Sequence, residues 1–452
     1  MHVLDRYFGI SAAGSTPRRE VVGGLTTFAT MSYIIFVQPT VLAMAGMDFG
    51  AVLLATCVSS AFACAVMGLV GRFPFALAPG MGENFLFTFA IVLGMGFRWQ
   101  AGLAIVFISG VLFLLLSLFR TREKIINVLP DTLKNAIGPA IGLFIAFVGL
   151  QWGGIVVLDP ATMVSLGGLH HGPPLICLAG VLVMATLLAR GHRWGILAGI
   201  LFTAGLGLAT GVLPFEYKAS GLNFSTFFQL DFAALLPRWQ EALAAILLFF
   251  FLDLFDTVGT LVGVSTQAGF VREDGKLPGA GRAFFSDALA TCAGALFGTS
   301  TVTSYIESAT GVAAGARTGL APLVTAVCFL FALLLAPVIT VVGYNVGPAY
   351  YEALQIENSM VSMYPAVAPA LIVVGFLMLA PLRNVKWDDL TEAVPAFFTL
   401  AMMAFSYSIT EGVAAGCISF TAIKLTTGRW REAHPLMYVI SAALLLRYAF
   451  LT

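Results

Sequence analysis

Charged side chains are scarce in this chain. Only 10% of its 452 residues are Asp, Glu, Lys or Arg, whereas soluble proteins carry about a quarter. Together with 59% hydrophobic residues and a mean hydropathy of +0.95, this scarcity excludes a soluble globular protein and predicts a polytopic membrane protein. The 23 basic and 23 acidic residues balance, so no net positive charge draws the chain to nucleic acid, and we expect no nucleic-acid partner.

Cysteine pairs are also missing. The six cysteines lie mostly inside apolar runs and form no CxxC pair, so their spacing matches neither a disulfide framework nor a zinc site. We interpret them as small apolar side chains and expect neither a metal nor a cofactor.

Long apolar runs are abundant, and fourteen of them can be read as membrane spans. They cover residues 21–45, 51–70, 75–93, 101–119, 135–152, 173–189, 194–213, 242–264, 284–298, 299–313, 319–342, 366–381, 391–408 and 410–427. A further run, 435–451, either spans the bilayer or lies in its interface.

The basic residues support this topology. With the N-terminus in the cytoplasm, the cytoplasmic side carries 19 of the 23 Lys and Arg residues, and the other side only Arg98, Lys218 and Arg238. Arg447, in the last apolar run, is set aside. Such a bias obeys the positive-inside rule and predicts a cytoplasmic N-terminus.

Two of the fourteen segments are predicted to be broken. Residues 75–94 hold Pro79, Gly80 and Gly82 where a continuous helix needs backbone hydrogen bonds, and residues 298–315 are rich in β-branched and hydroxyl side chains. Each segment reads as an extended piece followed by a half-helix. Non-helical backbone at membrane depth is tolerated only where it lines a cavity or is buried in protein, so these pieces indicate a transporter's binding site.

The chain also shows weak internal symmetry. Residues 195–211 align without gaps to residues 412–428, with six identical positions out of seventeen. These are the seventh and fourteenth segments, and the broken segments are the third and tenth. Seven spans per half is an odd number, so the two halves form an inverted repeat.

The eighth segment carries acids inside the membrane. Asp253, Asp256, Thr257 and Thr260 fall on one stripe of a helix. A charge at mid-bilayer costs at least ~2.5 kcal/mol, so such residues normally face a polar cavity or a partner. We interpret the stripe as part of a substrate or ion pathway; a structural contact between helices is the alternative for either acid.

Other polar residues could complete the site. Glu307 begins the half-helix of segment 10, where the helix dipole stabilises a carboxylate, unless it only caps that helix. Asp287 opens segment 9, and an acid at a helix start or a strut between helices is its preferred interpretation. Asn84 can both donate and accept hydrogen bonds, although a buried contact between helices is nearly as plausible for it.

Four stretches resemble one known family. They are APGMGENFLF (78–87), FLDLFDTVGTLVGV (251–264), SDALATCAGALFGTSTVTSYIESATGVAAGARTGL (286–320) and TEAVPAFFTLAMMAFSYSITEGVAAG (391–416). These stretches are similar to the AzgA-like purine permeases, a branch of the nucleobase–cation symporter-2 (xanthine/uracil permease) family. The similarity runs from about Arg18 to Arg431.

The resemblance implies an all-α membrane protein with fourteen transmembrane segments in a 7+7 inverted repeat. Segments 1–4 and 8–11 would form a core (transport) domain, and segments 5–7 and 12–14 a gate (scaffold) domain. The predicted parts are a cytoplasmic N-terminus, the core, the gate and a C-terminal segment, at 1–20, 21–119 with 242–342, 131–213 with 366–428, and 429–452.

The resemblance also implies a function. A homodimer in the plasma (inner) membrane would import adenine, guanine or hypoxanthine together with protons by an elevator-type mechanism, with the proton gradient as its energy source. By position, the family's carboxylates of segments 8 and 10 fall on Asp256 and Glu307, its segment-3 Asn on Asn84, and the acid that opens segment 9 on Asp287.

Two departures stand out. Glu83 lies where an apolar residue is expected, which leaves the proton stoichiometry and the preferred base open, and the stretch 343–364 is longer than expected.

We expect a purine, which is flat and nearly neutral, to donate its N–H groups to Asp256 and Glu307, which also exchange the coupled proton. Asn84, Glu83 and Thr260 are further expected contacts, and Asp253 and Asp287 support the site. Phe85 or Phe28 could cover the face of the base, with lipid-facing packing as an equal alternative for these two rings.

Other functions are less compatible with the sequence. The same fold could carry uracil, xanthine or an inorganic anion, but an anion carrier should have a basic residue near the half-helices, and segments 3, 8 and 10 hold no Lys or Arg. An intramembrane aspartyl protease would need a GxGD motif, which is absent. A neutral flat substrate explains the Asn and hydroxyl content better than an ion channel would.

Overall fold

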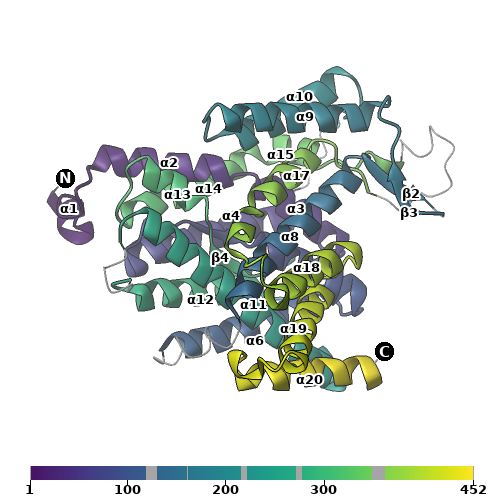
Figure 1. Ribbon diagram of the computed structural model, residues 1–452. Helices are drawn as coiled ribbons and strands as arrows, with labels where there is room; N and C mark the ends of the chain where they lie inside the picture. The colour runs from purple at the N-terminus through teal and green to yellow at the C-terminus, as the bar shows by residue number, and fades with distance from the viewer. Residues whose placement is uncertain are drawn as a thin grey trace. The chain divides into compact units, whose positions relative to one another are not determined.

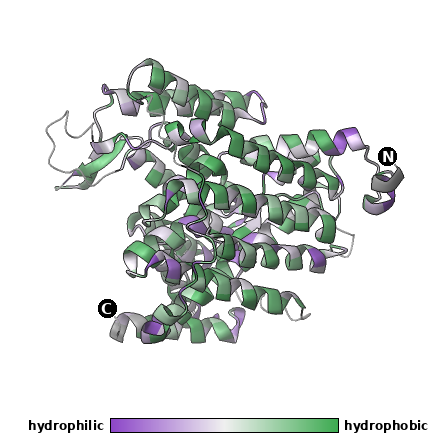
Figure 2. Cartoon of the chain, turned by 180° about the vertical axis from the view of Figure 1, so that it is seen from behind, coloured by the Kyte–Doolittle hydropathy of each residue, from purple (hydrophilic) through white to green (hydrophobic). Residues whose placement is uncertain are grey.

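The computed structural model describes residues 2–118, 130–159, 161–214, 221–270, 277–348 and 362–450. The described chain is mostly helical, with only short strands (Figure 1). Seven of its helices are long and apolar enough to cross a bilayer, and further apolar helices of 10–17 residues accompany them. Hydrophobic residues dominate the helices (Figure 2). The protein is an all-α polytopic membrane protein, as predicted.

The fourteen predicted spans correspond in order to described elements. The first seven are α2 (Pro17–Met31) with α3 (Ile34–Met44), α4 (Phe49–Val66) with η1 (Met67–Gly71), β1 (Leu77–Pro79) with α5 (Met81–Phe85) and η2 (Leu86–Gly94), α6 (Trp99–Leu118), α8 (Asp131–Trp152), α9 (Gly172–Ala189) and α10 (Gly195–Ala209). The next seven are α11 (Trp239–Gln267), α12 (Ala280–Phe297), β4 (Val302–Ser304) with α13 (Ser308–Ala313), α14 (Leu320–Ala332) with η4 (Leu333–Leu335) and α15 (Ala336–Val342), α17 (Ala368–Leu377) with η5 (Ala380–Asn384), α18 (Leu390–Phe405) and α19 (Ile409–Thr426).

The remaining elements lie outside the fourteen spans. They are α1 (His2–Phe8), a hairpin of β2 (Val156–Asp159) and β3 (Met163–Leu166), η3 (Ala233–Arg238), η6 (Trp430–Glu432) and α20 (Pro435–Phe450). Helix α20 packs against α19, and its part Pro435–Leu446 belongs to the shorter apolar helices. Most of the long stretch 343–364, including Tyr350, Tyr351 and Glu357, lies outside the described residues.

The third and tenth spans are broken, as the sequence predicts. In each, a three-residue strand precedes a short helix. The two strands form one antiparallel sheet, so the equivalent spans of the two halves run in opposite directions. This arrangement, with the same order of elements on either side, is the predicted 7+7 inverted repeat.

The chain divides into two compact units. One comprises Met1–Leu118 with Gly149–Ala370, and the other Phe119–Val148 with Leu371–Thr452. These units reflect how densely the segments pack, whereas the predicted core and gate domains are defined by relative motion. The core and gate division therefore stays a prediction.

Close packing in the first unit positions the half-helix α13. Helix α2 lies against both α13 and α14. At Gly311 of α13, a Cβ atom would overlap Thr27 Oγ1 and come 2.7 Å from the carbonyl oxygen of Gly23, so only glycine allows this approach. Small residues at helix contacts are typical of membrane proteins, where close van der Waals packing drives association.

Helix ends in this unit are capped by side chains. Thr16 accepts a hydrogen bond from the backbone N–H of Arg19, and Pro17 occupies the first helical turn of α2. At the C-terminal end of α13, the guanidinium of Arg317 donates to the carbonyls of Val312 and Ala316, both at 2.7 Å. A cation at a helix C-terminus is favourable, so Arg317 stabilises this half-helix.

A polar network lies at one end of the second unit. The ammonium group of Lys424, whose side chain is fully buried, pairs with Glu392 at 2.7 Å and Glu432 at 2.8 Å. Arg429 pairs with Glu432 and with Asp389, each at 2.8 Å. The network ties α18 and α19 to η6.

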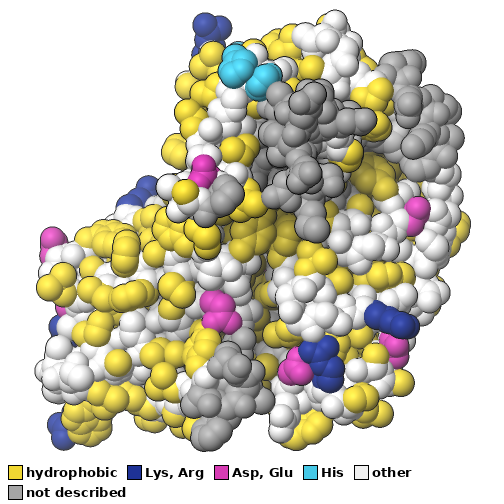
Figure 3. Space-filling model, turned by 90° about the vertical axis from the view of Figure 1, so that its right-hand side faces the viewer, with side chains coloured by type: hydrophobic (Ala, Val, Ile, Leu, Met, Phe, Trp, Pro, Cys, Tyr) yellow, Lys and Arg dark blue, Asp and Glu magenta, His cyan; other side chains and the backbone are white. Residues whose placement is uncertain are grey.

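Hydrophobic side chains also cover much of the surface in Figure 3, with only a few acidic and basic groups between them. Large exposed apolar residues include Leu182, Phe331 and Phe405. An apolar exterior is what a bilayer requires of a polytopic protein.

Candidate substrate site

The two broken spans meet at the centre of the candidate site. Strand β1 pairs antiparallel with β4, and Ala78 lies opposite Thr303. The backbone N–H of Gly80 continues the pairing with a 2.9 Å hydrogen bond to the carbonyl of Thr301. These bonds satisfy extended backbone that would otherwise be costly at membrane depth.

Each strand leads directly into a half-helix. Helix α5 follows β1 and α13 follows β4, so antiparallel pairing sends the two half-helices away from opposite ends of the sheet. Their N-termini therefore lie at opposite ends of the crossing. Helix N-termini carry unpaired N–H groups and a partial positive charge.

The predicted acids gather around this crossing. Helix α11 contacts β4, α13 and α5, and α12 contacts both strands. Glu83, Asp287 and Glu307 all interact electrostatically with Asp256. The structure thus brings together acids of spans 3, 8, 9 and 10. Within the described ranges, none of these acids forms an ion pair with Lys or Arg.

Asp287 joins three elements. Its carboxylate accepts hydrogen bonds from Thr257 Oγ1 of α11 at 2.5 Å and from Ser304 Oγ of β4 at 2.6 Å. The residue is fully buried on α12. Its geometry is that of a strut between spans 8, 9 and 10, one of the two structural roles preferred for it from the sequence.

Asp253 is fully buried one turn before Asp256 on α11. Thr291 donates to its Oδ2 at 2.9 Å, whereas no partner for its Oδ1 occurs in the part of the chain that the structure describes. Both Asp253 and Asp287 are thus fully buried, and each accepts hydrogen bonds from neighbouring hydroxyl groups.

Asp256 and Glu307 differ from these acids because they are accessible. Asp256 is exposed although its neighbour Thr257 is buried, and Glu307 is partly exposed. Glu307 occupies the N-cap position of α13, but its side chain makes no capping bond there. Its Oε1 instead accepts a 2.8 Å hydrogen bond from the hydroxyl of Tyr33. The side chain of Glu307 therefore does not cap its own helix but bonds to the first span.

Glu83, the unexpected acid of span 3, is almost fully buried. Its carboxylate folds back over the start of α5 and accepts a hydrogen bond from its own backbone N–H. A Cβ atom on Gly80 would overlap this carboxylate, so the glycine of the APGMG motif makes room for it.

Asn84 belongs to a buried group of amides and hydroxyls. Its Oδ1 accepts a hydrogen bond from Ser300, whose hydroxyl also lies 3.5 Å from Nε2 of Gln38. Gln38 donates to Thr299 at 2.6 Å. Asn84 Nδ2 and Gln38 Oε1 are buried and have no hydrogen-bond partner among the described residues. A buried unpaired donor and acceptor indicate groups that are available to a ligand or to water.

The predicted aromatic residues lie in packed surroundings. Phe85 is fully buried, stacks on Phe89 at 5.6 Å and lies 6.4 Å from Trp152. Phe28 contacts Phe329 of α14 edge to face at 5.2 Å. Thr260 is buried on α11, one turn beyond Asp256. The structure places Phe28 against α14 rather than against the crossing strands.

The sequence interpretation overlooked Tyr33 and Gln38. Both lie in the first span, on either side of the start of α3. A glutamine in an apolar run was an available signal, because polar groups inside the membrane are costly and usually functional. Tyr33 gave no comparable signal, since tyrosine is common in apolar segments.

Comparison with known proteins supports a transporter. A family model described as the permease family matches residues 18–350. The chain is 43% identical over 469 residues to the guanine/hypoxanthine permease PbuG of Bacillus subtilis (strain 168), an alignment that covers 99% of this chain and 100% of PbuG. It is 39% identical over 450 residues to the adenine permease AdeP of Escherichia coli (strain K12), covering 99% and 96% of the two chains. These relatives are named as permeases, which are transporters rather than proteases.

A solved structure has the same fold. The transmembrane domain of a cyanobacterial bicarbonate transporter, BicA, superposes with a TM-score of 0.59 at 13% identity, covering 88% of this chain and 96% of that domain. At this low identity, the superposition shows only that the two proteins share a fold. The full-length relatives and the family match, in contrast, confirm the resemblance seen in the motifs: the chain belongs to the permease family, that of the xanthine/uracil permeases.

Proposed function

We propose that this protein imports purine nucleobases, namely adenine, guanine or hypoxanthine, together with protons. The observation that carries the proposal is the full-length identity of 43% with a guanine/hypoxanthine permease. An adenine permease at 39% identity supports the same class of substrate.

The site chemistry fits a neutral heterocycle. Asp256 and Glu307 are the two accessible acids beside the crossing strands, and carboxylates accept hydrogen bonds from the N–H groups of a purine. The unpaired amide N–H of Asn84 is available for a purine acceptor atom. No cation neutralises the acids within the described chain, which disfavours an inorganic anion as cargo.

The same acids provide a route for coupling. Several carboxyl groups around one small site repel one another when all are charged. A proton that binds with the purine removes one negative charge before the site moves through a low-dielectric region, where an unpaired charge is very costly. Release of the proton inside the cell restores the charge. Asp256 and Glu307 are the groups that we assign to this exchange.

The transport motion that we propose is an elevator. Spans 1, 3, 8, 9 and 10, which form the site, all belong to the predicted core domain, so the site would move as one body against the gate domain. We further propose that the transporter acts as a homodimer in the plasma (inner) membrane with its N-terminus in the cytoplasm, in line with the distribution of basic residues.

Uptake of labelled hypoxanthine by cells that lack their own purine permeases tests this function. We expect saturable uptake that adenine and guanine compete for, that uracil and xanthine do not, and that a protonophore abolishes. Asp256→Asn should lose accumulation, whereas Asp131→Asn, at an exposed helix start, should not. Wild-type accumulation by Asp256→Asn, or uptake that is indifferent to the proton gradient, would contradict proton coupling through this acid.

A further inference from the structure

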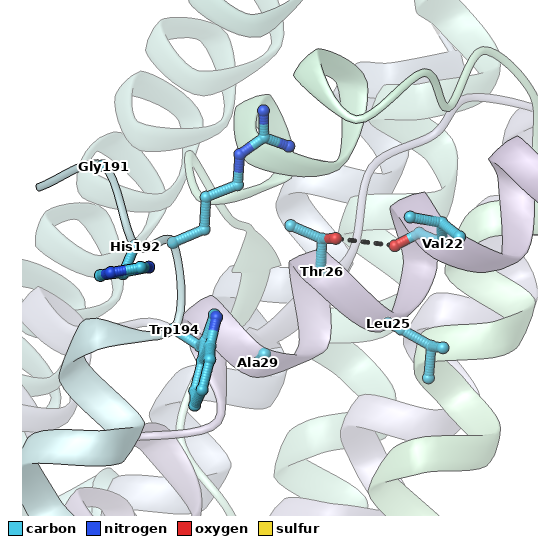
Figure 4. A pocket seen from close by; sticks show the side chains of 8 residues that line it. Val22, Leu25, Thr26, Ala29, Gly191, His192 and Trp194 are labelled. Atoms are coloured by element: carbon cyan, nitrogen blue, oxygen red, sulfur yellow. Dashed lines mark hydrogen bonds between the residues drawn. The ribbon is translucent and has the colours of Figure 1, made fainter. Parts of the chain in front are cut away.

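A groove of about 420 Å³ opens beside the first span. One wall is the stripe Val22, Leu25, Thr26 and Ala29 of α2, and the other is the loop of residues 191–194 that joins α9 to α10. In Figure 4, His192 and Trp194 lie across the groove from Thr26 and Ala29. Its size lies in the range of small-molecule sites, about 300–1,000 Å³.

The residues that follow the groove along the first span lead toward the candidate site. One residue beyond Ala29, the hydroxyl of Thr30 lies 3.1 Å from that of Thr310. One turn further, Tyr33 donates to Glu307. Thr30, at the end of α2, therefore contacts the half-helix α13, and Tyr33, just beyond α2, contacts the accessible acid at its start.

Arg193 stands at this junction. Its Nη1 donates a 3.0 Å hydrogen bond to the carbonyl of Thr310, three residues after Glu307. That carbonyl already accepts the helical hydrogen bond of Ala314 at 3.0 Å. The arginine contact is therefore additional to those that hold α13 together, and it can break without leaving a helix carbonyl unpaired.

The contact also joins two predicted domains. Arg193 and Trp194 belong to the predicted gate domain, and α2 and α13 to the predicted core domain. If these parts slide past each other during transport, the bond between Arg193 and Thr310 holds only in one state. The basic loop lies on the predicted cytoplasmic side, together with Arg190.

We propose that this groove is the cytoplasmic passage of the purine. Arg193 closes the end of the groove that lies nearest Glu307 through its hydrogen bond to the carbonyl of Thr310, which we call the latch. The proposal rests on the proposed function. A flat purine released from Glu307 would pass Thr30 and then Ala29 and Thr26, with the exposed indole of Trp194 as a surface on which it can stack.

Thiol labelling tests the passage. We expect Thr26→Cys to react with a membrane-impermeant thiol reagent added to inside-out vesicles, and saturating hypoxanthine to slow the reaction about fivefold or more. Thr427→Cys, at the exposed and predicted cytoplasmic end of α19, is the matched control, and its labelling should not respond to hypoxanthine. The wild-type chain gives the background from its own cysteines, five of which are buried.

Substitution of the arginine tests the latch. Arg193→Gln should keep the Kd for hypoxanthine within about twofold, because the residue does not contact Asp256 or Glu307, but should change the exchange rate in liposomes about fivefold, since one hydrogen bond to a charged group is lost. Arg190→Gln, in the same exposed loop, is the control and should behave like the wild type.

The outcomes separate the two proposals. A wild-type protein that neither binds nor takes up purines overturns the proposed function itself. Wild-type uptake accompanied by Thr26→Cys that is unreactive or unprotected overturns the passage. An exchange rate of Arg193→Gln equal to that of Arg190→Gln overturns the latch.

Discussion

Tyr33 shows how much the candidate site depends on single hydrogen bonds between distant parts of the chain. Its hydroxyl lies 2.8 Å from the carboxylate of Glu307, a residue 274 positions later in the sequence. Tyr33 itself is buried in the turn between α2 and α3. The phenol therefore fixes the orientation of an acid that remains partly accessible.

We expect Tyr33→Phe to raise the KM for hypoxanthine about tenfold, because a hydrogen bond to a charged group contributes roughly 1.5–3 kcal/mol and each 1.4 kcal/mol is a factor of ten in affinity. The maximal rate and the amount of protein in the membrane should change little, since the ring is retained. Initial uptake rates over a range of hypoxanthine concentrations measure both quantities.

Tyr7→Phe provides the matched control, because the hydroxyl of Tyr7 donates to the carbonyl of Leu69 and has no contact with Glu307. Equal KM values for Tyr33→Phe and the wild type would show that this hydrogen bond does not orient the acid for substrate.

Individual residues were predictable only where their chemistry is unusual in a membrane. Asp256, Glu307 and Asn84 stood out because charged and amide groups are rare in apolar spans. That Asp287 serves as a strut could be suggested but not fixed, since its partners Thr257 and Ser304 lie on two other elements. Tyr33 and Gln38 acquire meaning only through contacts with residues more than 250 positions away.

Among the elements, the half-helix α13 depends on close contact with α2. At Gly311 a Cβ atom would overlap Thr27 and press on the backbone of Gly23. Because α13 begins directly after Glu307, any displacement of the half-helix also displaces this acid.

We therefore expect Gly311→Val to reduce hypoxanthine uptake more than tenfold and to lower the melting temperature of the purified protein, since overpacking of a tight contact costs roughly 1–3 kcal/mol. Gly205→Ala is the control, because nothing lies within 4 Å of a Cβ built there on α10. Normal uptake by Gly311→Val would mean that α13 can shift without disturbing the site.

Element boundaries were predictable where the backbone cannot continue a helix. Pro79 lacks an N–H group and Gly80 and Gly82 favour irregular backbone, so the broken third span followed from the sequence. The interruption of the first span at Ser32 and Tyr33 carries no such signature. The β2–β3 hairpin also went unpredicted, because its short strands lie in a loop without alternating polarity.

The polar network of the second unit gives a prediction about acid stability. Hydrogen bonds from Arg429 and Lys424 lower the pKa of Glu432 to about 2, and those from Thr391 and Arg429 lower the pKa of Asp389 to about 2. A folded-state pKa below the unfolded values of about 4 means that both groups stabilise the fold above about pH 4 and lose this effect as the pH falls toward 2.

We expect the melting temperature of the detergent-solubilised protein to fall between about pH 4 and pH 2. The double variant Glu432→Gln and Asp389→Asn should start from a lower melting temperature at pH 7 and lose less of it on acidification. The same dependence on pH in the variant and the wild type would show that this network does not contribute to acid stability.

At the scale of the whole molecule, charge is distributed by depth. Lys and Arg gather on the predicted cytoplasmic side, whereas the acids at the crossing strands have no basic partner in the described chain. We expect such an arrangement to make the occupancy of the site depend on protons, because the cost of an unpaired buried charge is relieved most simply by protonation. Which of the acids exchanges a proton with water is then a question of access.

Access distinguishes Asp256 from Glu83. Asp256 is exposed, whereas Glu83 is 2% exposed and is bonded to its own helix. We therefore expect Glu83→Gln to leave proton stoichiometry unchanged and Asp256→Asn to uncouple transport. The accumulation ratio of hypoxanthine in proteoliposomes, with the membrane potential clamped at zero and a gradient of about one pH unit, measures the proton stoichiometry. One proton per purine supports about tenfold accumulation, and two protons support about a hundredfold. Glu83→Gln should reach the wild-type ratio, and Asp256→Asn should not exceed equilibrium. A tenfold drop in Glu83→Gln would instead identify the additional acid as the carrier of a second proton, despite its burial.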